Sequence, residues 1–236
     1  MTPTASEIRS RIAADPLWFP RVVLGRTYWS KQAEMYRGLH AHSTVAAKGG
    51  QSVGKTKGIG DYVAEIAATR PGRKIVLVGP KFEQIERNLW GAVREAFHDA
   101  ERRGAPLGGR LMATEWRAPK DEGWIAVAGA NREESLRLGH GEGFTVVVDE
   151  ATSFPAWAWR AVNGMLASEG AQLIVSFNPT DATDRTRMLC DDPTTAVYTL
   201  SCLDHPNVTS GENVYPGAVV RKWVDDFRAG LKSGKF

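Results

Sequence analysis

The sequence contains little cysteine and no long apolar segment. Its only cysteines, Cys190 and Cys202, are not part of a C-x-x-C pair, which argues against a disulfide scaffold and against a structural zinc site. No run of residues is long and uncharged enough to cross a bilayer, and charged residues interrupt the first sixteen positions, so we expect neither a membrane span nor a secretory signal. We therefore expect a cytoplasmic protein. Hydrophobic residues make up 42% and charged residues 24% of the chain, as in an ordinary globular domain.

Three nearly continuous apolar runs stand out, and they predict the centre of the fold. Runs of this length are typical of strands that are buried on both faces of a parallel sheet, and they occur at 74–79, 144–148 and 172–177. A shorter strand is expected at 43–47, with an antiparallel hairpin between 111–117 and 124–128. Apolar residues at helical spacing predict helices at 4–15, 31–39, 59–66, 82–97, 155–168 and, with Pro216 at its first position, 217–231. This alternation predicts an α/β fold whose mostly parallel sheet is covered by helices on both faces.

A glycine-rich loop follows the strand expected at 43–47 and matches the P-loop pattern G-x-x-x-x-G-K-[ST]. Its residues are Gly49, Gly50, Gln51, Ser52, Val53, Gly54, Lys55 and Thr56. In such a loop the backbone N–H groups surround a polyphosphate, the lysine contacts the β and γ phosphates, and the threonine hydroxyl ligates Mg²⁺. The alternative is an ordinary glycine turn. The strand before the loop and the helix after it favour the phosphate site, so ATP and Mg²⁺ are the expected cofactors.

Two acidic residues, Asp149 and Glu150, end the apolar run at 144–148. At this position Asp149 can hold the Mg²⁺ ion through water. Glu150 can orient a water molecule for attack on the γ phosphate and take its proton, which is the general-base role in nucleotide hydrolysis. An acidic pair is also a common way to end a strand, but the phosphate loop upstream favours the catalytic interpretation.

Two further polar sites are expected beside the nucleotide. Ser176 and Asn178 end the run at 172–177, where a hydroxyl and an amide could respond to the γ phosphate; the alternative is an ordinary Asn-Pro turn. Gln32 precedes the phosphate loop at a distance where its amide could read the adenine edge. The alternative for Gln32 is a solvent-facing position on a helix.

The order of these motifs along the chain carries two resemblances. The extra strand at 74–79, between the phosphate-loop strand and the Asp-Glu strand, resembles the additional-strand, catalytic-glutamate division of P-loop NTPases. From about residue 15 to 227 the chain also resembles the ATPase domain of the large terminase subunit of tailed bacteriophages. The segments that carry this second resemblance are Trp29-Ser-Lys-Gln32, the phosphate loop, Glu134-Ser-Leu-Arg137 with Gly139-His140, Asp149-Glu150-Ala151, Ser176-Phe-Asn-Pro179, His205-Pro-Asn-Val208 and Pro216-Gly217.

The terminase resemblance implies an ATP-driven motor that pumps double-stranded DNA into a procapsid. It implies a homo-oligomeric ring, typically a pentamer, with the portal protein and the small terminase subunit as partners, in the host cytoplasm and transiently at the portal vertex. Gln32 would then sense adenine, and Ser176 with Asn178 would form the coupling motif. By the same resemblance we expect lead-in helices with an adenine-side contact at 1–42, the ATPase core at 43–215, and a final helix with the start of a linker at 216–236.

The sequence departs from the terminase pattern in two ways. Some family members carry an arginine inside the phosphate loop, and this loop has none. A neighbouring subunit would then supply the arginine finger, with Arg137 as the first candidate and Arg132 as the second; either could also be an ordinary surface residue. No aspartate cluster of a nuclease follows Glu150, so we expect no nuclease site in this chain. The alternative functions are a helicase-like or DNA-remodelling P-loop ATPase and an ATP-gated protein switch.

Overall fold

The computed structural model describes residues 5–131, 133–136, 142–179 and 185–232. Within these ranges eight strands form one sheet in the order β3-β4-β5-β2-β6-β7-β1-β8. The pairs from β5 to β8 are parallel, and β3, β4 and β5 pair antiparallel. The strands are β1 (Thr44–Gly49), β2 (Lys74–Gly79), β3 (Arg110–Leu111), β4 (Glu115–Arg117), β5 (Trp124–Gly129), β6 (Phe144–Val148), β7 (Gln172–Phe177) and β8 (Ala196–Leu200). The mostly parallel sheet predicted from the sequence is confirmed.

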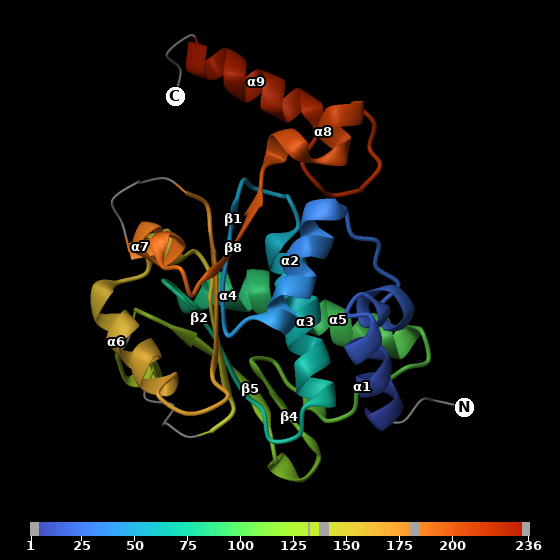
Figure 1. The fold of residues 1–236 in the computed structure, drawn as a ribbon, viewed down its shortest axis with the longest axis vertical. Coiled ribbons are helices and arrows are strands. Elements are labelled where there is room, and N and C mark those ends of the chain that lie inside the picture. The colour runs from blue at the N-terminus through green and yellow to red at the C-terminus, as the bar shows by residue number, and fades with distance from the viewer. Residues whose placement is uncertain (1–4, 132, 137–141, 180–184, 233–236) are drawn as a thin grey trace.

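Helices cover both faces of this sheet (Figure 1). The helices α6 and α7 lie on one face, and α1, α2, α3 and α5 lie on the other. The α-helices are α1 (Ala5–Ala14), α2 (Ser30–Ala41), α3 (Lys55–Thr69), α4 (Phe82–Ile85), α5 (Gly91–Arg102), α6 (Ala156–Met165), α7 (Arg185–Asp191), α8 (Pro206–Ser210) and α9 (Arg221–Lys232). Among the described residues no helix combines the length and the apolar character that a membrane span requires.

Alternate residues of the central strands enter two separate cores. In β6, Val147 belongs to the core under α2, α3 and α5, whereas Val146 and Val148 belong to the core under α6. The same alternation holds in β2, where Leu77 faces the first core and Val76 the second. Continuous apolar runs are needed here because neither face of these strands contacts water.

The strand order brings the predicted site residues to one edge of the sheet. In the sheet, β7 lies between β1 and β6. The strand β2, which follows β1 in the chain, lies on the other side of β6. Ala47 of β1 pairs with Ser176, and Val148 of β6 pairs with Val175. The carboxyl ends of β1, β7 and β6 therefore meet, and polar residues that follow parallel strands at such an edge can form one site.

Several element boundaries differ from those predicted. The last helix, α9, begins at Arg221, so Pro216 is not its first residue; Gly217 has a φ of +80°, which a right-handed helix cannot contain. The helix α6 ends at Met165, three residues before the predicted end, and Gly164 weakens its last turn. A tight turn splits the strand predicted at 111–117 into β3 and β4, closed by a bond from Met112 N–H to the carbonyl of Glu115. The helix predicted at 82–97 continues to Arg102 and contains a π-helical turn, Glu86–Trp90.

Among the α-helices and strands, three short elements were not predicted: α7, β8 and α8. The strand β8 pairs with β1 at the end of the sheet and has only one fully buried residue, Leu200. A strand that is half exposed and mixes polar with apolar residues gives no continuous apolar run, which is why the pattern missed it.

Candidate nucleotide-binding site

The glycine-rich loop joins the end of β1 to the first residue of α3. Ser52 and Gly54 adopt left-handed backbone conformations, with φ of +54° and +89°. Glycine reaches this region without the steric cost that a Cβ brings, which explains the second fixed glycine of the motif. The loop therefore ends at the N-terminus of α3, whose unpaired N–H groups and positive dipole end suit an anion.

Lys55 is held inside this loop by three oxygen atoms. Its Nζ donates to the carbonyls of Gly49 and Gly50, at 2.9 and 2.6 Å, and to Oδ1 of Asn178, at 2.9 Å. Burial lowers the pKa of Lys55 to about 8, although the charges of Asp149 and Glu150 act in the opposite direction. The lysine predicted to bind phosphate and the predicted coupling residue Asn178, which are 123 positions apart in the chain, are thus in direct contact.

Asp149 and Ser176 form the second contact at this edge. Asp149 is 4% exposed, and burial raises its pKa to about 6. The Ser176 hydroxyl donates to its carboxylate, which favours the charged form, while the nearby charge of Glu150 disfavours it. Two residues predicted from different strand ends therefore lie side by side.

Glu150 has an unusual backbone conformation. Its φ and ψ are 53° and 44°, in the left-handed region that non-glycine residues avoid at a cost of about 1–2 kcal/mol. The chain leaves β6 at this residue and turns into a short 3-10 helix, Ala151–Ser153. Strain of this kind persists only where the surroundings fix it, and it is concentrated at functional sites.

The oxygen donors at this edge suit Mg²⁺ bound together with a nucleotide. Thr56 supplies a hydroxyl and Asp149 a carboxylate, and the described parts of the chain contain no group of three or more His, Cys, Asp or Glu side chains that could hold a metal alone. Mg²⁺ prefers oxygen ligands and is usually held by one or two carboxylates, substrate phosphates and water. The residues present therefore fit this ion.

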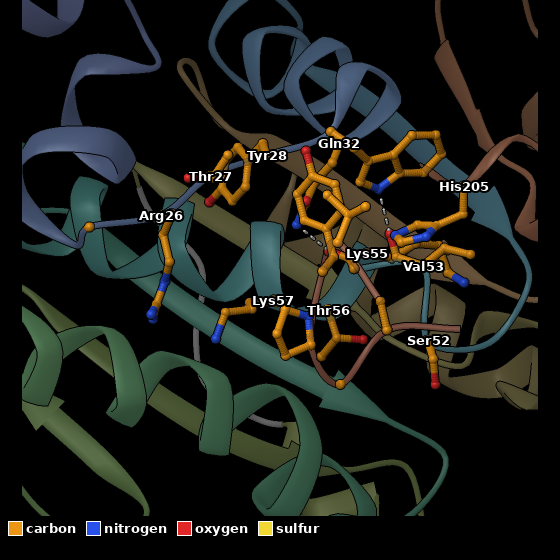
Figure 2. A pocket seen from close by; sticks show the side chains of 18 residues that line it. Arg26, Thr27, Tyr28, Gln32, Ser52, Val53, Lys55, Thr56, Lys57 and His205 are labelled. Carbon is orange, nitrogen blue, oxygen red and sulfur yellow. Dashed lines mark hydrogen bonds between the residues drawn. The ribbon is translucent and has the colours of Figure 1, made fainter. Parts of the chain in front are cut away.

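A cavity of about 770 Å³ adjoins the loop (Figure 2). Its lining comes from three parts of the chain, 25–32, 52–57 and 205–218. Gln32 is buried and donates from Nε2 to the carbonyl of Gly54 at 3.0 Å, while Trp29 donates from Nε1 to the carbonyl of Val53, also at 3.0 Å. The segment before α2 is therefore bonded directly to the phosphate loop.

Comparison with solved structures finds this fold in the large terminases of bacteriophages. The ATPase domain of the Thermus phage P74-26 large terminase superposes with a TM-score of 0.64 at 16% identity, over 79% of this chain and 84% of that one. The HK97 bacteriophage large terminase superposes with a TM-score of 0.68 at 11% identity, over 100% of this chain and 52% of that one. The fold is that of large terminase ATPase domains.

A further large terminase structure extends this comparison to a nucleotide complex. The large terminase of a thermophilic bacteriophage in complex with ATP-γ-S matches with a TM-score of 0.58 at 14% identity, over 76% of this chain and 46% of that one. This chain thus spans about half the length of that terminase and of the HK97 terminase. No protein-family model and no curated protein sequence matches the chain.

The candidate site contains most of the residues predicted from the sequence. The phosphate loop, Asp149, Glu150, Ser176 and Asn178 meet at one edge of the sheet, and Gln32 lines the cavity. The solvent-facing alternative for Gln32 is wrong, since this residue is 5% exposed; its adenine-sensing role stays a prediction. Arg132 and Arg137, the candidate arginine fingers, lie outside the described residues.

The structure adds lining residues that the sequence did not assign to the site. Arg26, Tyr28, His205 and Tyr215 line the cavity. His205 and Pro216 belong to segments that carry the terminase resemblance, but no role followed from the pattern. Their place in the site could not be predicted from the sequence, because residues near 30, 55 and 215 come together only in the folded chain.

Proposed function

We propose that this chain is the ATP-hydrolysing motor of a phage large terminase and that it drives double-stranded DNA into a procapsid. The observation that carries the proposal is the meeting of Lys55, Asp149, Glu150 and Asn178 at the carboxyl ends of β1, β6 and β7, beside a cavity large enough for a nucleotide. The terminase fold supports the same function, and the structures of the thermophilic phage terminase with ADP and ATP-γ-S support nucleotide binding.

In this proposal the phosphates of ATP replace the carbonyl oxygens that now surround Lys55. The loop N–H groups bind the phosphate oxygens, and Lys55 turns its ammonium group toward the β and γ phosphates. Thr56 and Asp149 would hold Mg²⁺, which supplies charge neutralisation at the phosphates when bound. Asp149 must be ionised for this role, and the hydrogen bond from Ser176 favours its ionised form.

Glu150 acts as the general base. Its carboxylate orients a water molecule and takes its proton as the water oxygen bonds to the γ phosphorus. The bond between that phosphorus and the oxygen bridging it to the β phosphate breaks, and the products are ADP and phosphate. The left-handed backbone of Glu150 sets the direction in which its side chain leaves β6.

Asn178 couples the chemistry to movement. Its amide oxygen accepts from Lys55, so a lysine that turns to the phosphates releases this contact. The contact can form again after the phosphate leaves. Because Asn178 follows β7, making or releasing this contact shifts the end of β7 and so acts on the sheet. DNA would be held through its phosphate backbone, in a ring of identical subunits at the portal protein and with the small terminase subunit as a further partner.

The test is Mg²⁺-dependent ATP turnover across a range of protein concentrations, with and without linear double-stranded DNA. Glu150→Gln removes the base and keeps the shape of the side chain, and Glu169→Gln is the matched control because that glutamate is exposed and lies in a loop before β7. We expect turnover per subunit to rise with protein concentration and with DNA, to vanish in Glu150→Gln, and to stay at the wild-type level in Glu169→Gln.

Each other result contradicts a named part of the proposal. Turnover that ignores both DNA and protein concentration would indicate a generic ATPase. Strand separation of the DNA would indicate the helicase-like alternative. ATP binding without turnover at any concentration, with a change in affinity for a protein partner, would indicate the ATP-gated switch.

A further inference from the structure

The wall of the cavity away from the phosphate loop comes from an exposed segment. Val214, Tyr215, Pro216, Gly217 and Ala218 line the cavity, and none of them is fully buried. A segment with so few buried side chains has little apolar packing to fix its position. Some other interaction must therefore hold this wall in place if the cavity is to keep its shape.

Asn207 supplies that interaction. Its side chain is buried, and its Oδ1 accepts from the N–H of Tyr215 at 2.7 Å while its Nδ2 donates to the carbonyl of Tyr215 at 2.8 Å. A further bond joins Nδ2 to Oδ1 of Asn213, at 3.3 Å. The amide thus pairs with both backbone groups of one residue, as a neighbouring strand would.

Only an amide can make this pair of bonds. A carboxylate at the same place could accept from the Tyr215 N–H, but it would set a second acceptor against the Tyr215 carbonyl. A shorter apolar side chain would leave both backbone groups of the half-buried Tyr215 without this partner, at a cost of about 1 kcal/mol or more for each lost hydrogen bond. The chemistry at position 207 is therefore closely tied to the position of Tyr215.

The wall is attached to the rest of the site at two further points. The N–H of Val219 donates to the carbonyl of Ser52 in the phosphate loop at 3.0 Å, and the ring of Tyr215 lies edge-on to His205, with centroids 5.6 Å apart. His205 packs in the same way on Trp29, at 5.1 Å. Asn207 thus fixes a wall that is continuous with the phosphate loop and with the aromatic residues before α2.

We propose that Asn207 is a positioning residue for the nucleoside of the bound nucleotide, an inference that rests on the proposed ATP site. The phosphates occupy the loop, so the base and ribose take the space between the segments 25–32 and 214–218. Tyr28, Trp29 and Tyr215 offer aromatic surface there, which suits a planar base. Asn207 touches neither base nor ribose; it holds the wall that does.

The test compares ATP with inorganic tripolyphosphate, which has the phosphates and lacks the nucleoside. Calorimetric affinities of both ligands, each with Mg²⁺, are measured for the wild type, Asn207→Asp and Asn207→Ala. Asn163→Ala is the matched control, since Asn163 is exposed on α6. We expect both Asn207 variants to bind ATP about tenfold or more weakly, as the loss of one or two hydrogen bonds to Tyr215 implies, and to bind tripolyphosphate within about twofold of the wild type.

Turnover gives a second measure. KM for ATP should rise in Asn207→Asp while kcat at saturating ATP stays close to the wild-type value, because the loop and Glu150 are untouched. If the Asn207 variants do not fold, Tyr215→Ala tests the same wall from a half-buried position, with the same selective loss of ATP affinity expected.

The results separate this inference from the function on which it rests. A wild-type protein that binds neither ligand has no phosphate site, which overturns both. One that binds tripolyphosphate and ATP equally well gains nothing from a nucleoside site, which overturns only this inference. A wild type that prefers ATP, with Asn207 variants that keep this preference, overturns only the role of Asn207. An equal loss of both ligands would also overturn it, since it would show that Asn207 supports the fold as a whole.

Discussion

At the scale of single residues, the fold changes the pH at which Lys55, the lysine of the phosphate loop, loses its charge. Burial lowers the pKa of this lysine to about 8, so half of it has lost its proton at that pH, where an ordinary lysine is still charged. Tripolyphosphate binding without metal needs the ammonium form. We therefore expect its affinity in calorimetry to fall about fivefold between pH 8 and pH 9 and further above it, and to change little between pH 7 and pH 7.5.

Lys55→Arg is the control for this titration, because a guanidinium keeps its charge throughout the range. Any change in its tripolyphosphate affinity with pH reports the ionisation of the ligand itself, so the wild-type affinity is divided by that of Lys55→Arg at each pH. A ratio that stays constant between pH 7 and pH 9 would contradict a lowered pKa at Lys55.

The residues of the site were predictable to different degrees. Lys55, Asp149 and Glu150 followed from local patterns, because a loop between a strand and a helix and an acidic end of an apolar run are encoded in adjacent residues. The bond from Lys55 to Asn178 was not predictable, since it depends on β7 lying between β1 and β6. The left-handed backbone at Glu150 also left no trace in the sequence, because glutamate rarely adopts it.

At the scale of elements, the packing of α2 on β8 depends on a glycine. A Cβ added to Gly38 would lie 2.1 Å from the hydroxyl oxygen of Tyr198, so the rigid ring of that residue would have to move. Alanine is favoured over glycine in a helix by about 1 kcal/mol, but displacing a packed ring costs about 1–3 kcal/mol. We expect Gly38→Ala to lower the free energy of unfolding, measured by urea denaturation.

Gly164 provides the opposite case for the same substitution. It lies in the last turn of α6, and no atom lies within 4 Å of a Cβ added there. Gly164→Ala should therefore raise the free energy of unfolding by up to about 1 kcal/mol, the helix propensity difference alone. If the two substitutions have the same effect, the close contact between α2 and β8 is not present in solution.

The sequence predicted the buried elements better than the exposed ones. The bounds of β2, β6 and β7 agree with the predicted runs because both faces of these strands are apolar. The strand β8 and the helices α7 and α8 were missed, since short and half-exposed elements carry no periodic signal. This matters for function, because α8 contains Asn207 and leads into the cavity wall.

At the scale of the whole molecule, the described residues that line the cavity include no unpaired cation for the transferred phosphate beyond Lys55. The other cationic lining residues among those the structure describes are Arg26 and Lys57, and both are paired with carboxylates. Arg26 contacts Asp61 at 3.2 Å and also Asp99, and Lys57 contacts Glu95 at 2.8 Å. An arginine from a neighbouring subunit of a ring would complete the site, as it does in other nucleotide hydrolases.

Mixed subunits test this completion. Glu150→Gln has no base but keeps its arginines, whereas Arg137→Ala and Arg132→Ala keep the base. In a ring assembled from equal amounts of Glu150→Gln and the correct arginine variant, about one interface in four combines an intact base with an intact arginine, so about a quarter of the wild-type turnover should return.

Lys55→Ala mixed with Glu150→Gln is the control. Each change disables the phosphate site of the subunit that carries it, and an arginine from the neighbouring subunit can repair neither. Its turnover should stay at the level of the separate variants. If the arginine mixtures behave like this control at every ratio and at saturating protein concentration, neither Arg137 nor Arg132 acts across the interface. The charge at the γ phosphate would then have to come from within the subunit, and each site would hydrolyse ATP independently of its neighbours.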